Sequence, residues 1–134
     1  GAYVGVIVRM LNALDAGERP VIHGDGSQSY DFIDVRDCAR ANVLAMQSAS
    51  TNQYYNVGTG IKTSIAELVD LLSVRHPNKA TARFESGERP FVRNRVGDTR
   101  RASREINFSA EIDLDVGLRE FIQWRSKQHL EEQV

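Results

Sequence analysis

The sequence predicts a single α/β domain over residues 1–134, in the form of a small α+β-like lobe with a charged tail from about 128 to 134. Three observations support this prediction. Apolar residues at helical spacing alternate with short β-type runs along the chain. Hydrophobic residues make up 41% of the sequence and charged residues 26%, as is ordinary for a soluble globular protein. No internal repeat or low-complexity tract interrupts this pattern.

The first part of the chain is expected to contain two helices and two strands. Apolar residues at i, i+3, i+4 and i+7 predict a helix over residues 3–16. A short strand at 21–23 ends in a Gly-Asp-Gly turn, because Gly accepts positive φ and Asp can bond its own backbone. Residues 30–35 alternate as a strand and lead into a second helix at 36–48, for which Asp34 is the expected N-cap.

The second part continues the alternation and ends in helices. The expected elements are a strand at Tyr54–Val57, a helix that begins after a capping box of Ser64 and Glu67, a strand near Thr81–Glu85, an irregular segment at 86–97, a helix at about Asp98–Glu105 and a last helix at about Leu114–His129.

The composition argues against a membrane-spanning or disulfide-bonded protein, and the charged residues are distributed unevenly along the chain. No apolar run approaches the roughly 20 residues of a membrane-spanning helix, and no signal-peptide pattern is present. Cys38 is the only cysteine, which excludes an internal disulfide and agrees with a reducing, cytoplasmic location. Residues 75–104 carry a net charge of +6, so the remainder carries −7. This segment is expected either to attract an anion or to form an ordinary solvated basic face.

A glycine-containing turn at Gly58–Gly60 lies between an expected strand and an expected helix, as nucleotide-binding loops do. The dinucleotide fingerprint needs a third glycine where Thr63 stands. A P-loop needs Gly directly before its Lys, whereas Ile61 precedes Lys62. We therefore interpret the segment as a strand-to-helix turn.

No catalytic or metal-binding pattern stands out in the sequence. The three histidines lie far apart and lack metal-ligand spacing. Cys38 lies on a helix face with small residues, where a buried structural thiol is expected. Four carboxylates occur close together, namely Asp25, Asp31, Asp34 and Asp37. Turn, strand and capping roles explain most of them, and a cation site is the minor alternative.

The segment Arg95-Val96-Gly97-Asp98 places a guanidinium and a carboxylate on either side of a glycine. Arginine pairs with phosphate oxygens through forked hydrogen bonds, and a carboxylate can accept from ribose hydroxyls. The combination suits a nucleotide. A nucleic-acid surface would need more aromatic residues than Phe84 and Phe91 among these arginines, so nucleic acid is the less favoured partner.

Taken together, these segments resemble the carboxyl-terminal part of the extended short-chain dehydrogenase/reductase family, in particular its NAD-dependent nucleotide-sugar epimerases and dehydratases of the UDP-glucose 4-epimerase type. The resemblance covers essentially the whole chain. The matching pieces, in the order of the family, are Tyr3–Ile7, His23–Gln28, Asp31–Asp37, Tyr55–Gly60, Arg95–Asp98 and the closing helix from Gly117 to Trp124.

That family also has an amino-terminal Rossmann domain, with a glycine-rich NAD loop and a catalytic Tyr-x-x-x-Lys pair. Neither motif occurs in these 134 residues, because no tyrosine has a lysine four positions later. The resemblance therefore implies that this chain holds no cofactor, has no catalytic residues and does not perform the NAD-dependent reaction alone.

The resemblance further implies a substrate-binding role for the start of the first helix and the end of the strand after it. Gly5 and Val6 match the helix start that approaches the diphosphate of a nucleotide sugar. His23 occupies a place where an aromatic ring commonly lies against the base, and an imidazole can stack there less strongly.

Three later residues complete the implied binding site. Arg95 matches an arginine that contacts the diphosphate, and Asp98 matches an acid near the ribose. Tyr30 stands where many relatives carry Arg, so this chain offers a hydroxyl there and no charge.

In that family the segment Tyr54–Val57 joins the Rossmann sheet, and the helix at 36–48 packs beside it. Without that sheet, apolar surface would be exposed, and we expect the chain to form a homo-oligomer that covers it. Three readings remain open: the nucleotide-sugar-binding part of a longer or truncated epimerase or dehydratase, a free-standing nucleotide-binding or oligomerisation module without catalysis, and, less favoured, a nucleic-acid-binding protein.

Overall fold

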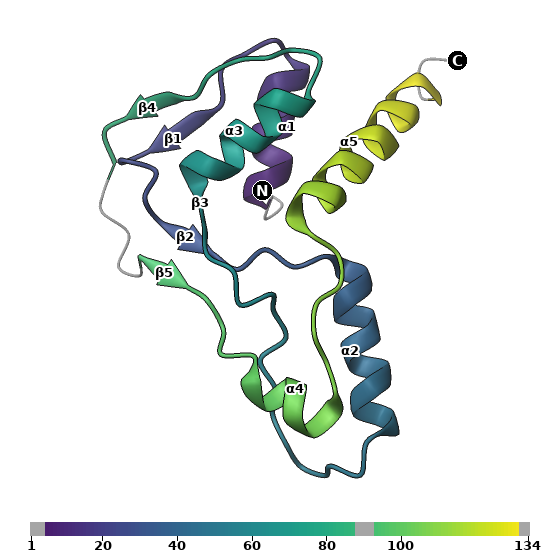
Figure 1. The fold of residues 1–134 in the computed structure, drawn as a ribbon. Helices are drawn as coiled ribbons and strands as arrows, with labels where there is room; N and C mark the ends of the chain where they lie inside the picture. Colours follow the sequence, from purple (N-terminus) through teal and green to yellow (C-terminus); the bar gives the residue numbers. More distant parts are fainter. Residues whose placement is uncertain (1–4, 88–92, 132–134) are drawn as a thin grey trace.

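The computed structural model describes residues 5–87 and 93–131 and shows five helices and five short strands within them (Figure 1). The elements in chain order are α1 (Val6–Asp15), β1 (Val21–His23), β2 (Ser29–Tyr30), α2 (Val35–Gln47), β3 (Thr63–Ser64), α3 (Ile65–Arg75), β4 (Arg83–Glu85), β5 (Asn94–Arg95), α4 (Arg100–Ile106) and α5 (Leu114–Glu131). The predicted α/β class is confirmed. Residues 3 and 4 of the predicted first helix and the end of the charged tail lie outside the described residues.

The strands form two small sheets. In one, β1 and β4 run parallel, with Ile22 opposite Phe84. In the other, β2 lies between β3 and β5 and pairs antiparallel with β3 and parallel with β5. Tyr30 is therefore flanked by Thr63 on one side and Arg95 on the other.

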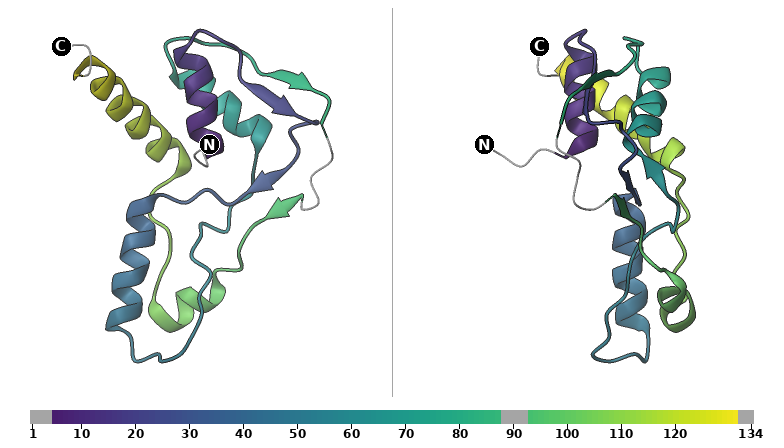
Figure 2. Two further views of the ribbon diagram at one scale, coloured as in Figure 1. Left: turned by 180° about the vertical axis from the view of Figure 1, so that it is seen from behind. Right: turned by 90° about the vertical axis from the view of Figure 1, so that its left-hand side faces the viewer.

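Most of the apolar burial lies where α1, α3 and α5 come together beside β1 (Figures 1 and 2). Each helix contributes apolar residues at helical spacing, so their stripes face one another. We call the resulting cluster the main core; its buried members are Met10, Leu11, Leu14, Ile22, Ile65, Leu68, Val69, Leu72, Leu118 and Ile122.

A second cluster lies at the other end of the molecule, between α2 and α4 (Figure 2). Its buried members are Ala41, Ala102, Ile106 and Phe108, and we call it the small core. The segment between β2 and α2 joins the two clusters, because Phe32 packs on the main core and the next residue, Ile33, packs on the small core. Because side chains alternate along this extended segment, the neighbouring residues Phe32 and Ile33 pack on different cores.

The predicted helix starts are confirmed at two sites. Asp34 caps α2 by accepting a hydrogen bond from the Arg36 backbone N–H at 2.9 Å. Ser64 and Glu67 form the expected capping box: the Glu67 N–H donates to the Ser64 hydroxyl at 3.1 Å, and the Ser64 N–H donates to the Glu67 carboxylate at 2.7 Å. These contacts satisfy backbone donors that a helix start leaves unpaired.

The predicted strands differ from the structure in three places. Tyr54–Val57 is not a strand, because none of the described segments pairs with it, and Tyr54 is 90% exposed. The predicted strand at 30–35 is reduced to β2, since the backbone pairing with β5 ends at the hydrogen bond from the Asp31 N–H to the Arg95 carbonyl. The segment at 86–97, expected to be irregular, contains β5.

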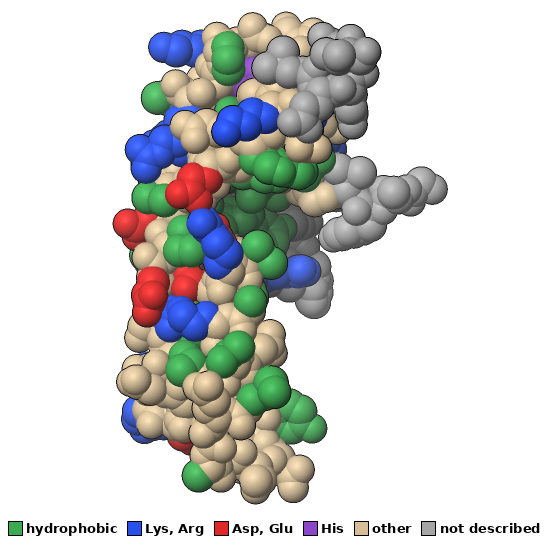
Figure 3. All heavy atoms as spheres, turned by 90° about the vertical axis from the view of Figure 1, so that its right-hand side faces the viewer, with side chains coloured by type: hydrophobic (Ala, Val, Ile, Leu, Met, Phe, Trp, Pro, Cys, Tyr) green, Lys and Arg blue, Asp and Glu red, His purple; other side chains and the backbone are tan. Residues whose placement is uncertain are grey.

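Apolar side chains remain exposed along one face of α2. Val35, Val43 and Met46 are 77%, 50% and 85% exposed, and they fall with the exposed Ala39 within one arc of the helix. We call these four residues the apolar stripe of α2. Figure 3 shows hydrophobic side chains on the face of the molecule that carries α5 and α2, around a hollow near its middle. None of the helices in the described part is long and apolar enough to cross a membrane.

Candidate functional site

A cleft of about 320 Å³ opens between the start of α1, the end of β1 and the sheet of β2 and β5. It brings together five of the six residues to which the resemblance assigned substrate contacts: Gly5, Val6, His23, Tyr30 and Arg95. Its other lining residues are Arg9, Met10, Val21, Ile22, Gln28 and Ile65. Residues from five separate segments of the chain therefore form one candidate binding site.

The first turn of α1 forms one wall of this cleft. Gly5 is the N-cap, in an extended conformation with φ −60° and ψ 154°, and no side chain caps the helix start. No acidic residue occupies the first turn, and a Cβ at Gly5 would meet no atom within 4 Å. The unpaired N–H groups of a helix start carry partial positive charge, so this wall favours an anion.

A second wall comes from the pairing of β2 with β5. Tyr30 and Arg95 are register partners, and the guanidinium carbon of Arg95 lies 6.0 Å from the centre of the Tyr30 ring. Phe32 supports the ring from behind, with its centroid 5.9 Å from that of Tyr30. The aromatic face holds the guanidinium at the cleft by a cation–π contact.

His23 lies at the end of β1, where the chain enters the Gly24 turn. Its side chain is exposed and lines the cleft. The Gln28 amide donates to the His23 carbonyl at 3.4 Å, which ties the two ends of the turn together. The imidazole itself makes no hydrogen bond or ion pair within the described part of the chain, so its ring can contact a ligand.

Asp98 does not lie in the cleft with the other five residues. Its carboxylate accepts hydrogen bonds from the Arg100 side chain and from the Arg100 backbone N–H at 3.1 Å, at the start of α4. Hydrogen bonds from Arg100 lower the pKa of Asp98 to about 2. The residue is engaged in an ion pair here, and the expected contact with a ribose has no support in this geometry.

The charged side chains among the described residues of the cleft are of one sign. Arg9 and Arg95 line it, and none of its described lining residues is Asp or Glu. Among the residues that the structure describes, neither arginine forms an ion pair. The sequence reasoning missed Arg9, although its position four residues after Gly5 puts it on the same helix face.

The turn at Gly58–Gly60 is closed by a carboxylate from β2's end. Asp31 accepts hydrogen bonds from the Thr59 N–H at 2.8 Å, the Thr59 hydroxyl at 2.6 Å and the Gly60 N–H at 2.9 Å. A Cβ at Gly58 would lie only 2.4 Å from an Asp31 oxygen, so glycine is required there. Because Asp31 takes the N–H groups that a phosphate would need, this loop does not fit the pyrophosphate of NAD.

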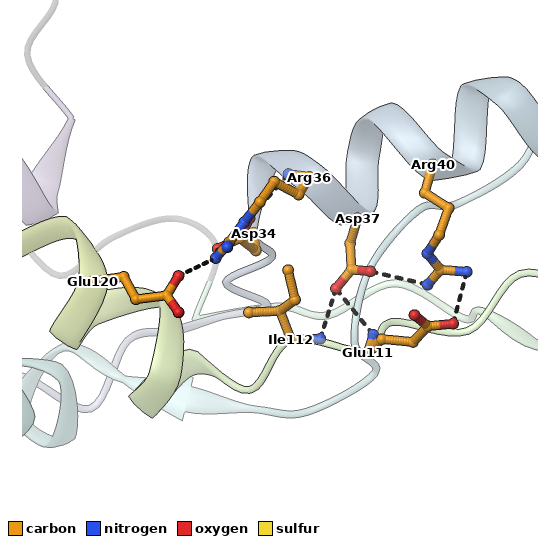
Figure 4. Close-up of polar contacts among 7 residues, drawn as sticks. All are labelled: Asp34, Arg36, Asp37, Arg40, Glu111, Ile112 and Glu120. Atoms are coloured by element: carbon orange, nitrogen blue, oxygen red, sulfur yellow. Dashed lines mark hydrogen bonds and ion pairs between the residues drawn. The ribbon is translucent and has the colours of Figure 1, made fainter. Parts of the chain in front are cut away.

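Asp37 joins α2 to the segment before α5 (Figure 4). Its buried carboxylate accepts from the Glu111 and Ile112 N–H groups at 3.0 Å each and from Arg40 at 2.9 Å. Burial raises the pKa of Asp37, but the hydrogen bonds from Ile112, Arg40 and Glu111 outweigh it and hold that pKa below its usual value. This carboxylate is structural.

Asp34 has a similar structural role one turn earlier. The Arg36 guanidinium donates two hydrogen bonds of 2.9 Å to its carboxylate and forms an ion pair with Glu120 on α5 at 2.7 Å (Figure 4). Asp34 and Asp37 thus take the expected capping and first-turn positions of α2. Asp31, which was expected within a strand, instead follows β2 and closes the Gly58–Gly60 turn. Within the described residues, no group of His, Cys, Asp and Glu side chains could hold a metal ion.

His76 is also structural and links three helices at the edge of the main core. The Asn78 N–H donates to its Nδ1 at 3.1 Å, which leaves Nε2 to donate to Asp15 at 2.9 Å. Arg125 on α5 donates to the other oxygen of Asp15 at 2.7 Å. Burial raises the pKa of Asp15, but these hydrogen bonds from His76 and Arg125 outweigh it and lower that pKa.

Comparison with known proteins finds a family to which part of the chain is similar. The model of the NAD dependent epimerase/dehydratase family matches residues 2–58, which include the start of α1, β1, β2 and α2. Over these residues the chain is similar to this family. The matched residues contain four of the five predicted site residues that line the cleft, since only Arg95 lies beyond them.

Individual relatives agree with this similarity. A UDP-glucose 4-epimerase of Mycolicibacterium smegmatis is 36% identical over 108 residues, which are 81% of this chain and 32% of that protein. The structure of a UDP-glucose 4-epimerase of Thermotoga maritima with UDP-glucose matches with a TM-score of 0.87 at 27% identity, over 95% of this chain and 41% of that one. A UDP-N-acetylglucosamine 4-epimerase of Methanobrevibacter ruminantium, in complex with UDP-N-acetylmuramic acid, matches with a TM-score of 0.85 at 30% identity, over 96% and 41%.

The chain spans 32–40% of the length of the first curated relatives it matches. It thus has the fold of one part of an epimerase, as predicted from the sequence. These relatives are nucleotide-sugar enzymes of an NAD-dependent family, and most of each enzyme lies outside the region that this chain matches.

Proposed function

We propose that this chain forms the nucleotide-sugar-binding lobe of an NAD-dependent epimerase or dehydratase and is not catalytic alone. The observation that carries the proposal is the cleft, whose lining includes both the uncapped start of α1 and Arg95, and none of whose described lining residues is a carboxylate. Both features favour a phosphate group. A volume of about 320 Å³ is near the lower end of ligand pockets, which run from roughly 300 to 1,000 Å³. The cleft therefore suits the nucleotide diphosphate, with the sugar extending beyond it.

The role of the lobe is binding and orientation. Oxidation of a sugar hydroxyl needs NAD, and the loop at Gly58–Gly60 does not fit this cofactor because Asp31 fills it. The cofactor and the proton-transferring residues would come from another part of the enzyme. The lobe would hold the nucleotide so that the sugar points toward them, which lowers the entropic cost of the reaction.

Calorimetric titration of the chain with UDP and UDP-glucose tests this proposal. We expect both ligands to bind and Arg95→Ala to weaken both by about tenfold or more, as loss of one charge-assisted hydrogen bond would do. Arg119→Ala, an exposed arginine of α5 outside the cleft, is the matched control and should leave binding unchanged. Absence of binding to either ligand would contradict the proposal.

The alternative is a free-standing nucleotide-binding or oligomerisation module without catalysis. The same cleft would serve it, so the titration alone does not separate the two. The genomic context does: coding sequence for a Rossmann half directly upstream favours the enzyme, and its absence favours the module.

The apolar stripe of α2 supports a second proposal, namely that the isolated chain associates with a copy of itself. Val35 and Met46, the most exposed residues of the stripe, lie on the same side of α2, and Tyr54 just beyond the helix is 90% exposed. Apolar surface of this kind is normally covered in a soluble protein. A second copy, which presents the same stripe, would cover it in an isologous contact.

Sedimentation at micromolar concentration tests this association. We expect a dimer for the unchanged chain and a monomer for the double variant Val43→Glu, Met46→Glu, since the introduced charges would face each other across the contact. Gln123→Glu, at an exposed position of α5 outside the stripe, controls for added charge. A monodisperse monomer for the unchanged chain would contradict the proposal.

A further inference from the structure

Arg9 is a cleft residue to which neither the sequence pattern nor the resemblance gave a role. It lies one helical turn after Gly5, and its side chain lines the same cleft as Arg95. The residue is exposed, and no hydrogen bond or ion pair of its guanidinium occurs within the part of the chain that the structure describes. An arginine that only stabilised α1 would be expected to pair with a neighbouring carboxylate.

Arg9 and Arg95 reach the cleft from different elements. Arg9 comes from α1, and Arg95 comes from β5, where it lies over the Tyr30 ring at 6.0 Å. Tyr30 also lines the cleft and contributes a hydroxyl and no charge. Among the described lining residues, the second positive side chain is therefore Arg9.

Two guanidinium groups that line one cleft, with no acid among its described lining residues, favour an anion bound between them. A monophosphate can be held by one such group, whereas a diphosphate offers oxygens on two phosphorus atoms and more charge. Each guanidinium can donate two parallel hydrogen bonds to one phosphate group. The chemistry of the cleft thus matches a diphosphate better than a monophosphate.

We propose that Arg9 is the second phosphate-binding residue of the cleft and sets its preference for a nucleoside diphosphate over a nucleoside monophosphate. This inference rests on the proposed function, because it assigns a role within the same nucleotide-binding cleft. It goes beyond that function by naming the residue that selects the ligand class.

Calorimetric titration of the whole chain with UDP, UMP, uridine and inorganic pyrophosphate tests the assignment. In Arg9→Ala we expect UDP and pyrophosphate to bind about tenfold or more weakly, UMP to be affected less and uridine not at all. Arg9→Lys should recover part of the loss, because it restores the charge and not the forked geometry. Arg119→Ala is the control, and thermal unfolding of every variant verifies that each is folded.

The outcomes separate this inference from the function on which it rests. UDP binding that Arg95→Ala weakens and Arg9→Ala leaves unchanged would overturn the role of Arg9 and leave the proposed function standing. An equal loss of UDP, UMP and uridine in Arg9→Ala would also overturn it, since that pattern indicates a structural role. If the unchanged chain binds pyrophosphate through both arginines but no nucleotide, the second phosphate contact holds while the nucleotide preference and the proposed function fail. If it binds neither, both fail.

Discussion

The main core and the small core differ in how much apolar surface they bury. The main core joins three helices and a strand, and residues such as Leu11, Leu68 and Leu72 are fully buried in it. The small core joins α2 and α4 through one large side chain, Phe108, and three smaller ones. The exposed apolar stripe lies on α2, so the poorly buried end of the molecule is also the end that presents surface for a partner.

This difference agrees with the location of the cleft. The cleft is lined by residues of α1 and β1 and by Ile65 of α3, all of which rest on the main core. A binding site on a well-packed element keeps its geometry without help from other domains. We therefore expect ligand binding and association to belong to different ends of the molecule and to respond to different substitutions.

The largest expected effect is at the centre of the main core. Leu68→Ala removes a fully buried side chain from α3, and the cavity should lower the free energy of unfolding by about 2–5 kcal/mol. Val74→Ala, on the same helix but 68% exposed, should change it by less than about 0.5 kcal/mol. Urea unfolding measures both. Equal effects of the two substitutions would show that the main core does not dominate stability.

A smaller and more local effect is expected at the small core. Asp37→Ala removes the acceptor for the Glu111 and Ile112 N–H groups and one partner of Arg40, which should cost about 1–3 kcal/mol. Hydrogen exchange should accelerate in α2, α4 and residues 111–112, with little change in α1 and α3. Asp70→Ala, an exposed carboxylate of α3, is the control.

Uniform acceleration of exchange in Asp37→Ala would contradict this comparison. It would show that the two cores unfold together as one cooperative unit.

The features that sequence reasoning predicted are those fixed by short-range chemistry. The helix stripe at Ile65, Leu68 and Leu72, the capping box at Ser64 and the N-cap at Asp34 all depend on residues within one or two helical turns of each other. Such patterns are visible in a sequence because the contacts they create are local.

The features that it missed depend on segments distant in the sequence. Tyr54–Val57 has the composition of a strand, yet a strand needs a neighbour, and none of the described segments supplies one. Arg9 shares a helix face with Gly5, but that spacing does not reveal that the same cleft also holds Arg95 of β5.

The smallest and most discriminating effect is expected in acid. Asp15 at the main core and Asp37 at the small core both have pKa values below the usual value. Each ionised carboxylate therefore stabilises the folded state above pH about 4. This stabilisation is lost as the pH falls through the folded-state pKa. Because less apolar burial supports α2 and α4, we expect them to lose exchange protection at a higher pH than α1 and α3. Amide exchange from pH 5 to 2.5 measures this order. If α1 and α3 lose protection first, the hydrogen bonds of Asp15 contribute more to stability than the packing around them. The amount of apolar burial would then not determine which end of the molecule is more stable in acid.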